Sequence, residues 1–317
     1  MLSSMENFSI VIPLLNEAQN IPILANEIDE VLRDVRVKWE TIWVDDGSTD
    51  QSWQELIKLT KNHKAIRLSR NSGQSTAIMA GCDQAKFDLI VTLDADLQNN
   101  PKDIPRLLDA LTNELDCVCG IREKRNDKLF SRKIPSLIAN FIARKITKVP
   151  VSDLGCTLRV FRKHLVTDNR LIGEMHRVLP VYFHLSGARI KQIDVDHRNR
   201  RFGESKYGLE RIFKFVADIF LAKVMNKIST RPLYFFGLIS LLLWALGVIL
   251  VSFPLFGAMG ASSEWNFSSV GLISILSGIT SFFFAILITL LGLITEVLIR
   301  KTNTRTENEQ YNLVEFK

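Results

Sequence analysis

The residues with the clearest chemical potential form a short acidic segment, Asp94-Ala95-Asp96-Leu97-Gln98, directly after an apolar run. We expect this segment to be extended, with both carboxylates on the same side and the amide oxygen of Gln98 two residues further on. Hard oxygen ligands in this arrangement suit Mg²⁺ or Mn²⁺, which bridge to substrate phosphates. An isolated Asp-x-Asp also occurs as a pair of solvated loop acids, so its meaning depends on its surroundings.

Two other polar clusters also follow apolar runs. Pro13–Glu17 comes after the β-branched run that begins at Phe8, and Asp45–Ser48 comes after Glu40–Val44. The acidic segment at residue 94 follows Leu89–Leu93 in the same way. In open parallel sheets, ligands bind outside the carboxyl ends of the strands. We therefore expect the three clusters to converge on one crevice.

The elements that must position these clusters follow from hydrophobic periodicity, which alternates between strand and helix patterns. We expect strands at Phe8–Pro13, Glu40–Val44, Ala65–Leu68, Leu89–Leu93 and Asp116–Gly120, and helices at Ile21–Val35, Gln51–Asn62, Ser72–Ala85 and Ile104–Asn113. This alternation predicts an α/β fold with an open, mainly parallel sheet. The chain contains neither the GxGxxG fingerprint of dinucleotide binding nor a P-loop.

Near the C-terminus, Leu233–Phe253 and Val270–Ile299 are almost free of charge and long enough to cross a bilayer. We interpret both as transmembrane helices, the alternative being two buried helices of a soluble core. The joining segment Pro254–Ser269 contains no Lys or Arg, whereas basic residues flank both spans. The positive-inside rule therefore predicts that both termini are cytoplasmic.

Two basic, apolar segments, Ile134–Val149 and Leu209–Ile228, are typical of amphipathic helices at a membrane interface. For the first, an ordinary surface helix is an equal alternative. The net charge of +6 comes without a nucleic-acid-binding motif, and its basic residues gather beside the spans. Anionic lipid is thus a better partner than nucleic acid. The four cysteines lack metal-ligand spacing and are expected to be buried thiols. No cleavable signal peptide is expected at the start of the chain.

Several motifs in order resemble a known family. The segments FSIVIPLLNE, WVDDGSTD, LSRNSGQSTAIMAG, LDADLQNNP, VSDLGCTLRVF, GEMHRVLP and HRNRRFGESKYGLERIFKF, followed by two spans, resemble family-2 glycosyltransferases of the Rossmann-like GT-A fold. They are most similar to the polyprenyl-phosphate glycosyltransferases, a group that includes dolichol-phosphate mannose synthase, undecaprenyl-phosphate glucosyltransferases and aminoarabinose transferases. The resemblance covers nearly the whole chain.

The resemblance implies a donor site at the strand ends. The residues that it places in the nucleotide pocket are Pro13, Leu14, Asn16, Glu17, Asp45 and Asp46. Asp45 would contact the base, and Gly73 would let the donor-binding loop approach the nucleotide. Asp94, Asp96 and Gln98 match the family's metal site, although Asp94 could instead hold the ribose or the sugar. A structural alternative is that Asp45 and Asp46 cap the helix that follows them.

The resemblance also implies cations that grip a lipid phosphate: Arg122, Arg132, Arg200, Arg201 and Lys206. Arginine offers forked phosphate contacts and lysine acts as a point charge. The alternative is that this charge run forms a solvated face.

Asp153 is implied on the acceptor side, where it would orient a sugar hydroxyl or Arg159, and its alternative role is that of a turn acid. His176 could equally be a structural histidine or a ligand.

The implied reaction is inverting transfer of a sugar, first of all glucose from UDP-glucose, to undecaprenyl phosphate at the cytoplasmic face of the inner membrane. GDP-mannose, UDP-N-acetylglucosamine and UDP-aminoarabinose are alternative donors. Two spans and the lack of a QxxRW-like motif disfavour a processive polysaccharide synthase. A non-enzymatic alternative is an inactive adaptor of a flippase system.

The expected organisation is a catalytic domain at 1–208, a juxtamembrane segment at 209–231, a two-helix anchor at 232–300 and a tail at 301–317. We also expect a homo-oligomer, for which a tetramer is one candidate.

Overall fold

The computed structural model describes residues 6–60, 62–122, 145, 147–167, 175–199, 210–260 and 269–311 of the 317-residue chain. In the three long C-terminal helices, side chains are described at 217–225, 227–228, 231–254 and 270–299. The chain divides into two compact units, Met1–Lys223 and Val224–Lys317. The first unit continues beyond the domain boundary that we expected at residue 208.

The described part of the first unit contains a seven-stranded sheet in the order β3-β2-β1-β4-β6-β5-β7. Its strands are β1 (Phe8–Leu14), β2 (Trp39–Asp45), β3 (His63–Arg67), β4 (Leu89–Thr92), β5 (Cys117–Arg122), β6 (Arg159–Arg162) and β7 (Ile190–Val195). All neighbouring pairs are parallel except those that involve β6, which is antiparallel to β4 and β5. The predicted mainly parallel α/β sheet is therefore confirmed.

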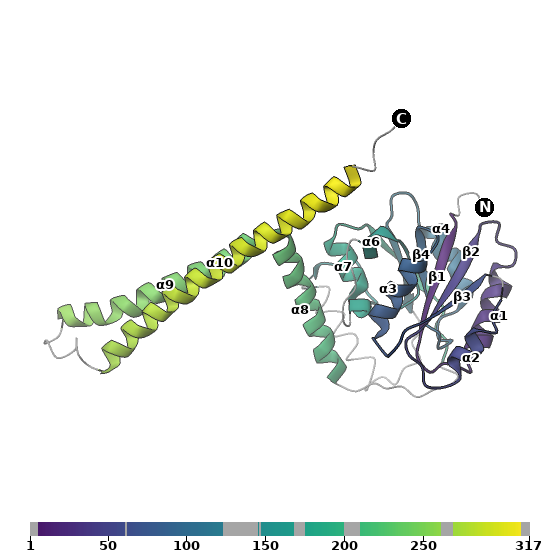
Figure 1. The fold of residues 1–317 in the computed structure, drawn as a ribbon, viewed down its shortest axis with the longest axis horizontal. Coiled ribbons are helices and arrows are strands. Elements are labelled where there is room, and N and C mark those ends of the chain that lie inside the picture. The colour runs from purple at the N-terminus through teal and green to yellow at the C-terminus, as the bar shows by residue number, and fades with distance from the viewer. Residues whose placement is uncertain are drawn as a thin grey trace. The chain divides into compact units, whose positions relative to one another are not determined.

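Helices cover both faces of this sheet. One face carries α1 (Ile21–Leu32), α2 (Ser52–Leu56), the 3-10 helix η1 (Pro101–Asp103) and α4 (Ile104–Ala110). The other carries α3 (Gln74–Gln84), α6 (His164–Thr167), the 3-10 helix η3 (Met175–Val178) and α7 (Leu179–Leu185). In Figure 1, α1 and α2 lie on one side of the strands, and α3 and α7 lie on the other.

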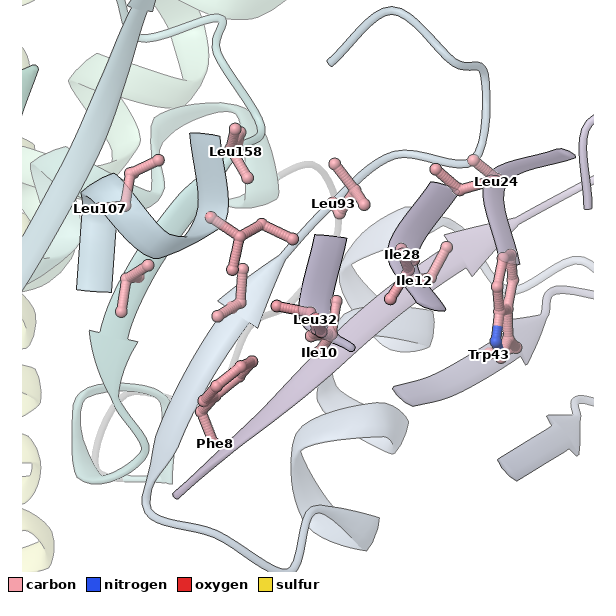
Figure 2. Packing of buried hydrophobic residues seen from close by; sticks show 14 of the residues in the cluster. Phe8, Ile10, Ile12, Leu24, Ile28, Leu32, Trp43, Leu93, Leu107 and Leu158 are labelled. Atoms are coloured by element: carbon pink, nitrogen blue, oxygen red, sulfur yellow. The ribbon is translucent and has the colours of Figure 1, made fainter. Parts of the chain in front are cut away.

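Alternation along the strands divides the core into two layers, because successive side chains of a strand point to opposite faces. Phe8, Ile10 and Ile12 of β1 are fully buried on the α1 face, whereas Val11 is buried on the α3 face. Figure 2 shows the first layer, with Leu24 and Ile28 of α1 packed over β1 and β2. All four cysteines are buried and free, as the sequence predicts.

Helix α3 lies unusually close to the sheet at Gly81. A Cβ atom on this residue would lie 2.4 Å from Cγ1 of Val11 and 3.1 Å from Cγ2 of Val44. Only a residue without a side chain permits this approach. The close contact packs the C-terminal half of α3 against β1 and β2.

A third apolar cluster involves the middle of the next helix, α8 (Glu210–Thr230). Within the first unit, Ile219 and Ala222 of α8 are fully buried against a cluster that includes Val151 and Val181. On the same helix, Phe220 is 63% exposed. The helix thus contributes to the core of the first unit and also presents apolar side chains outward.

The second unit contains two long helices, α9 (Pro232–Gly260) and α10 (Ser269–Tyr311). The segments Pro232–Pro254 and Val270–Ile299 are long and apolar enough to cross a membrane. Only 11% of the most apolar 18 residues of each segment are buried. The helices are joined by polar contacts within apolar surroundings: Ser240 Oγ donates to the Ala285 carbonyl at 2.8 Å. Such hydrogen bonds are a common way of pairing helices in lipid.

Several boundaries differ from those that we predicted. The helix expected at Gln51–Asn62 is the short α2. Helix α9 continues to Gly260, although its apolar span ends at Pro254, one residue from the end that we expected. The amphipathic segment Ile134–Val149 lies mostly outside the described residues. Strands β6 and β7 were not predicted, because β6 is only four residues long and neither has a clear period-2 pattern.

Candidate active site

The three polar clusters do converge at one edge of the sheet. Strands β2, β1 and β4 are neighbours and parallel, and Leu14 at the end of β1 pairs with Asp45 at the end of β2. The backbone N–H of Asp46 donates to the Leu14 carbonyl at 2.9 Å, and the N–H of Leu93 donates to the Val11 carbonyl at 3.2 Å. Pro13 lies one residue before the end of β1. The segments that follow these strands therefore start side by side.

Asp46 holds the loop that precedes α3. Its buried carboxylate accepts from the backbone N–H of Ser72 at 2.7 Å and of Gly73 at 2.9 Å. Gly73 has φ +92°, a conformation that L side chains rarely adopt. Two hydrogen bonds to one carboxylate fix this loop beside the strand ends. Asp46 thus positions the expected donor-binding loop, and its contact with a nucleotide stays a prediction.

Asp45 and Asn16 organise the neighbouring turn. Asp45, which is fully buried, accepts from the Ser48 N–H at 2.7 Å, and its other oxygen lies 3.1 Å from Nε of Arg67. Asn16 adopts φ +60°, and its Oδ1 accepts from the Thr49 N–H at 2.9 Å. These contacts cap the turn at Ser48 and not helix α2, which begins at Ser52 without a side-chain capping hydrogen bond, so the capping alternative for Asp45 is wrong. Its predicted contact with a base is not tested by them.

Glu17 lies next to this turn. Its backbone N–H donates to Ser52 Oγ at 2.8 Å, and its carboxylate accepts from the Asn20 side chain. The loop after β1 is thereby attached to the loop after β2.

Asp94, just beyond β4, is oriented by two side chains distant in sequence. Gln74 Nε2 donates to its Oδ1, and Thr157 Oγ1 donates to its Oδ2, both at 2.8 Å. Burial and the nearby Asp96 carboxylate raise the pKa of Asp94 to about 6, against the hydrogen bond from Thr157 and the charge of Arg159. The site therefore concentrates negative charge that a cation would relieve.

Asp96 and Gln98 follow in a constrained turn and not in the extended segment that we expected. Asp96 is 7% exposed, and its Oδ1 accepts from the Gln98 N–H at 3.1 Å. Between them, Leu97 has φ +62° while its side chain is buried in the core. A left-handed conformation costs a non-glycine residue on the order of 1 kcal/mol or more, and such strain concentrates at functional sites. Burial of Leu97 holds the turn in place.

Arg122 and Asp153 form a bidentate ion pair. Arg122 Nε and Nη2 donate to the two carboxylate oxygens at 2.7 Å each, and both side chains are 11% exposed. A Cβ on Gly155 would lie 2.5 Å from Arg122 Nη2, so the glycine makes room for the pair. In this structure Arg122 is held by Asp153, and its predicted contact with a lipid phosphate stays a prediction.

The hydrogen bonds described for Arg159 are to backbone carbonyls and not to Asp153, the partner that we expected. Its Nη1 and Nη2 donate to the carbonyls of His176 at 3.2 Å and of Leu154 at 2.8 Å, and the residue is 2% exposed. His176 is buried and pairs with Ser75, whose Oγ lies 2.9 Å from Nδ1 and accepts from the His176 N–H at 3.0 Å. This geometry agrees with the structural alternative for His176.

Four predicted cations lie outside the described residues. These are Arg132, Arg200, Arg201 and Lys206. Their predicted contacts with a lipid phosphate stay predictions.

Sequence reasoning missed the residues that orient the acidic pair. Gln74 belongs to the loop that we singled out for Gly73, and Thr157 lies four residues after Asp153 in the VSDLGCT segment. Both are ordinary polar residues, and only their hydrogen bonds with Asp94 reveal their role.

Residues 9–169 match the family described as glycosyl transferase family 2. Dodecaprenyl-phosphate galacturonate synthase of Rhizobium johnstonii is 38% identical over 250 residues, which cover 77% of this chain and 74% of that protein. Undecaprenyl-phosphate 4-deoxy-4-formamido-L-arabinose transferase of Pectobacterium carotovorum is 35% identical over 273 residues, covering 84% and 80%. The protein of the same name from Yersinia pestis is 38% identical over 256 residues, covering 78% and 76%.

Among solved structures, glucosyl-3-phosphoglycerate synthase from Mycobacterium tuberculosis, in complex with Mn²⁺, uridine diphosphate and glucosyl-3-phosphoglycerate, has a TM-score of 0.51. Its sequence identity is 18%, and the match covers 69% of this chain and 79% of that one. At this identity the likeness concerns the fold alone, and it confirms the expected GT-A arrangement of the sheet.

Proposed function

This chain belongs to glycosyltransferase family 2, and on that premise we propose that it transfers a sugar from a nucleotide-sugar donor to the phosphate of a polyprenyl lipid. The observation that carries the proposal is the pair of carboxylates, Asp94 and Asp96, just after the central strand β4 and beside the loops after β1 and β2. The lipid acceptor is supported by relatives whose names specify dodecaprenyl and undecaprenyl phosphates. Two helices that could span a membrane agree with it.

The chemistry requires control of charge more than removal of a proton. A phosphate monoester is already ionised near neutral pH, so its oxygen can attack the anomeric carbon without a general base. The bond from that carbon to the donor diphosphate breaks, and the nucleoside diphosphate leaves with the electron pair. One such displacement inverts the anomeric centre. The site must therefore stabilise an anionic leaving group while it admits an anionic acceptor.

The residues at the end of β4 fit a divalent cation. Asp94 and Asp96 supply hard oxygen ligands, and a bound cation would offset the burial of the Asp94 carboxylate and its proximity to Asp96, which together raise the pKa of Asp94. Among the described residues, no group of three His, Cys, Asp or Glu side chains forms a closed metal cage. Gln98 and substrate phosphate oxygens would complete the coordination. The cation would supply Lewis-acid stabilisation of the departing diphosphate.

The other described residues orient this machinery. Gln74 and Thr157 fix the carboxylate plane of Asp94 through their two hydrogen bonds. Asp46 holds the backbone of the loop at Ser72 and Gly73, where a nucleotide would lie. These contacts preorganise the donor site, so the loop need not be ordered when the donor binds.

On the acceptor side we propose that Arg132, Arg200, Arg201 and Lys206 contribute the cations that bind the lipid phosphate. The distribution of Lys and Arg around the two spans supports a location of this site at the cytoplasmic membrane face. A homo-oligomer stays part of the proposal, and crosslinking in membranes would test it.

For the donor, the names of the relatives favour galacturonate and 4-deoxy-4-formamido-L-arabinose over glucose. We therefore propose one of these two sugars as the first candidate. Glucose, which the sequence resemblance led us to expect, serves as a comparison donor.

The proposal is tested by incubating the purified full-length chain, in lipid nanodiscs, with undecaprenyl phosphate and each labelled donor in turn. The panel contains uridine-diphosphate-linked galacturonate, formamido-arabinose, aminoarabinose, glucose and N-acetylglucosamine, and GDP-mannose. We expect one donor to give a lipid-linked sugar, whose mass identifies it, in a reaction that EDTA stops and Mg²⁺ or Mn²⁺ restores. Failure of every donor in the presence of metal would refute the proposal and favour the inactive adaptor.

A further inference from the structure

The segment after β7 runs along the acidic turn. The backbone N–H of Arg198 donates to the Gln98 carbonyl at 2.8 Å, and His197 forms an antiparallel bridge with Asn99. One residue earlier, the Asp196 N–H donates to Asp103 Oδ2 at 2.7 Å. Residues 196–198 therefore form a short segment that is hydrogen-bonded along residues 98–103. Residues 98–103 follow Asp94 and Asp96 in the chain.

Arg198, the last residue of this segment, forms an ion pair with helix α1. Arg198 Nη1 lies 2.9 Å from Oε1 and 2.8 Å from Oε2 of Glu27, so one guanidinium nitrogen donates to both carboxylate oxygens. Their side chains are 26% and 23% exposed. On either side of Glu27, Leu24 and Ile28 are fully buried in the core, so this carboxylate projects from a firmly packed helix.

The segment 196–198 contacts a strained turn at Leu97. Leu97 adopts a left-handed conformation, and the next residue, Gln98, is the one whose carbonyl accepts from Arg198. A strained turn persists only when its surroundings over-determine it. The side chain of Asn100 also contacts this segment, because its Nδ2 donates to Asp196 Oδ2 at 3.1 Å.

We propose that the Glu27–Arg198 ion pair is a brace for the metal loop, defined as residues 94–98, and that it sets the affinity of this loop for a divalent cation. Glu27 and Arg198 are positioning residues: neither side chain needs to touch the cation. The pair fixes the Arg198 backbone, which fixes the Gln98 carbonyl and so the orientation of the turn that presents Asp96. The inference rests on the proposed function only in taking residues 94–98 as the metal loop.

The test uses the full-length chain in nanodiscs and needs no turnover. Binding of Mn²⁺, in the presence of uridine diphosphate, is measured from the electron paramagnetic resonance signal of free Mn²⁺. Substitution of a residue that orients a metal ligand without touching the metal typically weakens metal binding by about 10- to 100-fold. Because Glu27 acts through two successive contacts, we expect Glu27→Gln to raise the dissociation constant by about tenfold, at the lower end of that range.

Hydrogen exchange gives the second readout. We expect Glu27→Gln to accelerate exchange of the Arg198 and Gln98 amides while the amides of β1 remain protected. The matched control is Glu30→Gln, which removes the same charge from an exposed position on the same helix. It should change neither exchange nor Mn²⁺ binding.

A double-mutant cycle separates the brace from a direct role of Arg198. If the pair acts as a unit, Glu27→Gln, Arg198→Gln and the double variant weaken Mn²⁺ binding to a similar extent. A much larger loss in Arg198→Gln than in Glu27→Gln would overturn the proposal, because Arg198 would then act on the ligand itself. Unchanged exchange and binding in Glu27→Gln, or no Mn²⁺ binding by the wild type, would also overturn it. If the wild type binds Mn²⁺ but transfers no sugar, only the proposed function fails.

Discussion

Replacement of Asp153 by alanine should strongly destabilise the first unit. The change removes a bidentate ion pair with Arg122 whose two N–O distances are 2.7 Å, in a site where both side chains are 11% exposed. It also removes the acceptor for the backbone N–H groups of Arg122, at 3.2 Å, and of Gly155, at 3.1 Å. The Arg122 guanidinium would remain in place without this counter-charge.

The expected loss in free energy of unfolding follows from the burial of the pair. Removal of one partner from a buried pair costs about 3–5 kcal/mol, and the remaining 11% exposure of each side chain places this pair near the lower limit, about 3 kcal/mol. For a unit of this size, each kcal/mol lowers the melting temperature by about 2–4 °C. We therefore expect the first unfolding transition to fall by roughly 6–12 °C.

The assay is thermal unfolding of the full chain in detergent micelles, followed by tryptophan fluorescence, to which three of the five tryptophans, Trp39, Trp43 and Trp53, contribute from the first unit. Asp194→Ala is the control, since Asp194 is an exposed carboxylate on β7, and it should shift the melting temperature by less than about 2 °C. The double change Arg122→Gln with Asp153→Asn should be less harmful than the sum of the single changes, because it removes both charges of the pair together. A melting temperature for Asp153→Ala within the range of the control would refute the reasoning.

Three further predictions concern the acidic pair, the acceptor and pH. Asp96→Ala should lower turnover by about 10²–10³-fold at an unchanged melting temperature; near-normal turnover in the lipid transfer assay would exclude Asp96 from the site. Lys206→Ala should raise KM for polyprenyl phosphate without changing KM for the donor, and steady-state kinetics with each substrate varied would decide this. Although burial opposes it, hydrogen bonds from Lys64 and from the Lys86 backbone lower the pKa of Glu40 below 4.5. The folded state therefore gains stability from the Glu40 carboxylate above that pH and loses it as the pH falls through the lowered value. Melting curves between pH 7 and pH 3 should show a smaller acid-induced loss in Glu40→Gln than in the wild type; equal losses would contradict the assignment.

The sequence by itself predicted the parts of the fold that depend on local pattern. Apolar, β-branched runs identified β1, β2, β3, β4 and β5, because a buried strand of a parallel sheet needs apolar side chains on both faces. The position of polar residues after these runs predicted that the polar clusters would meet, since parallel strands end at the same edge. Long uncharged stretches likewise identified α9 and α10 as candidate spans.

The sequence did not predict which side chains would hold the acidic pair or the cations in place. Asp94 binds Thr157, 63 residues away, and Arg198 binds Glu27, 171 residues away. Neither spacing follows a helical or strand period, so no local pattern announces these contacts. Arg122 illustrates the consequence, because its charge suggested a phosphate ligand and the fold gives it a carboxylate partner at 2.7 Å.

The division has a physical origin. Hydrophobic periodicity and strand-end chemistry are properties of neighbouring residues, and they are sufficient to specify five of the seven strands, the acidic segment and the two apolar helices. The partner of a buried charge depends on which strands become neighbours, and here the insertion of antiparallel β6 between β4 and β5 brings Thr157 and Arg159 beside Asp94. Only the tertiary structure decides that arrangement, because it is set by packing between segments that are far apart in the chain.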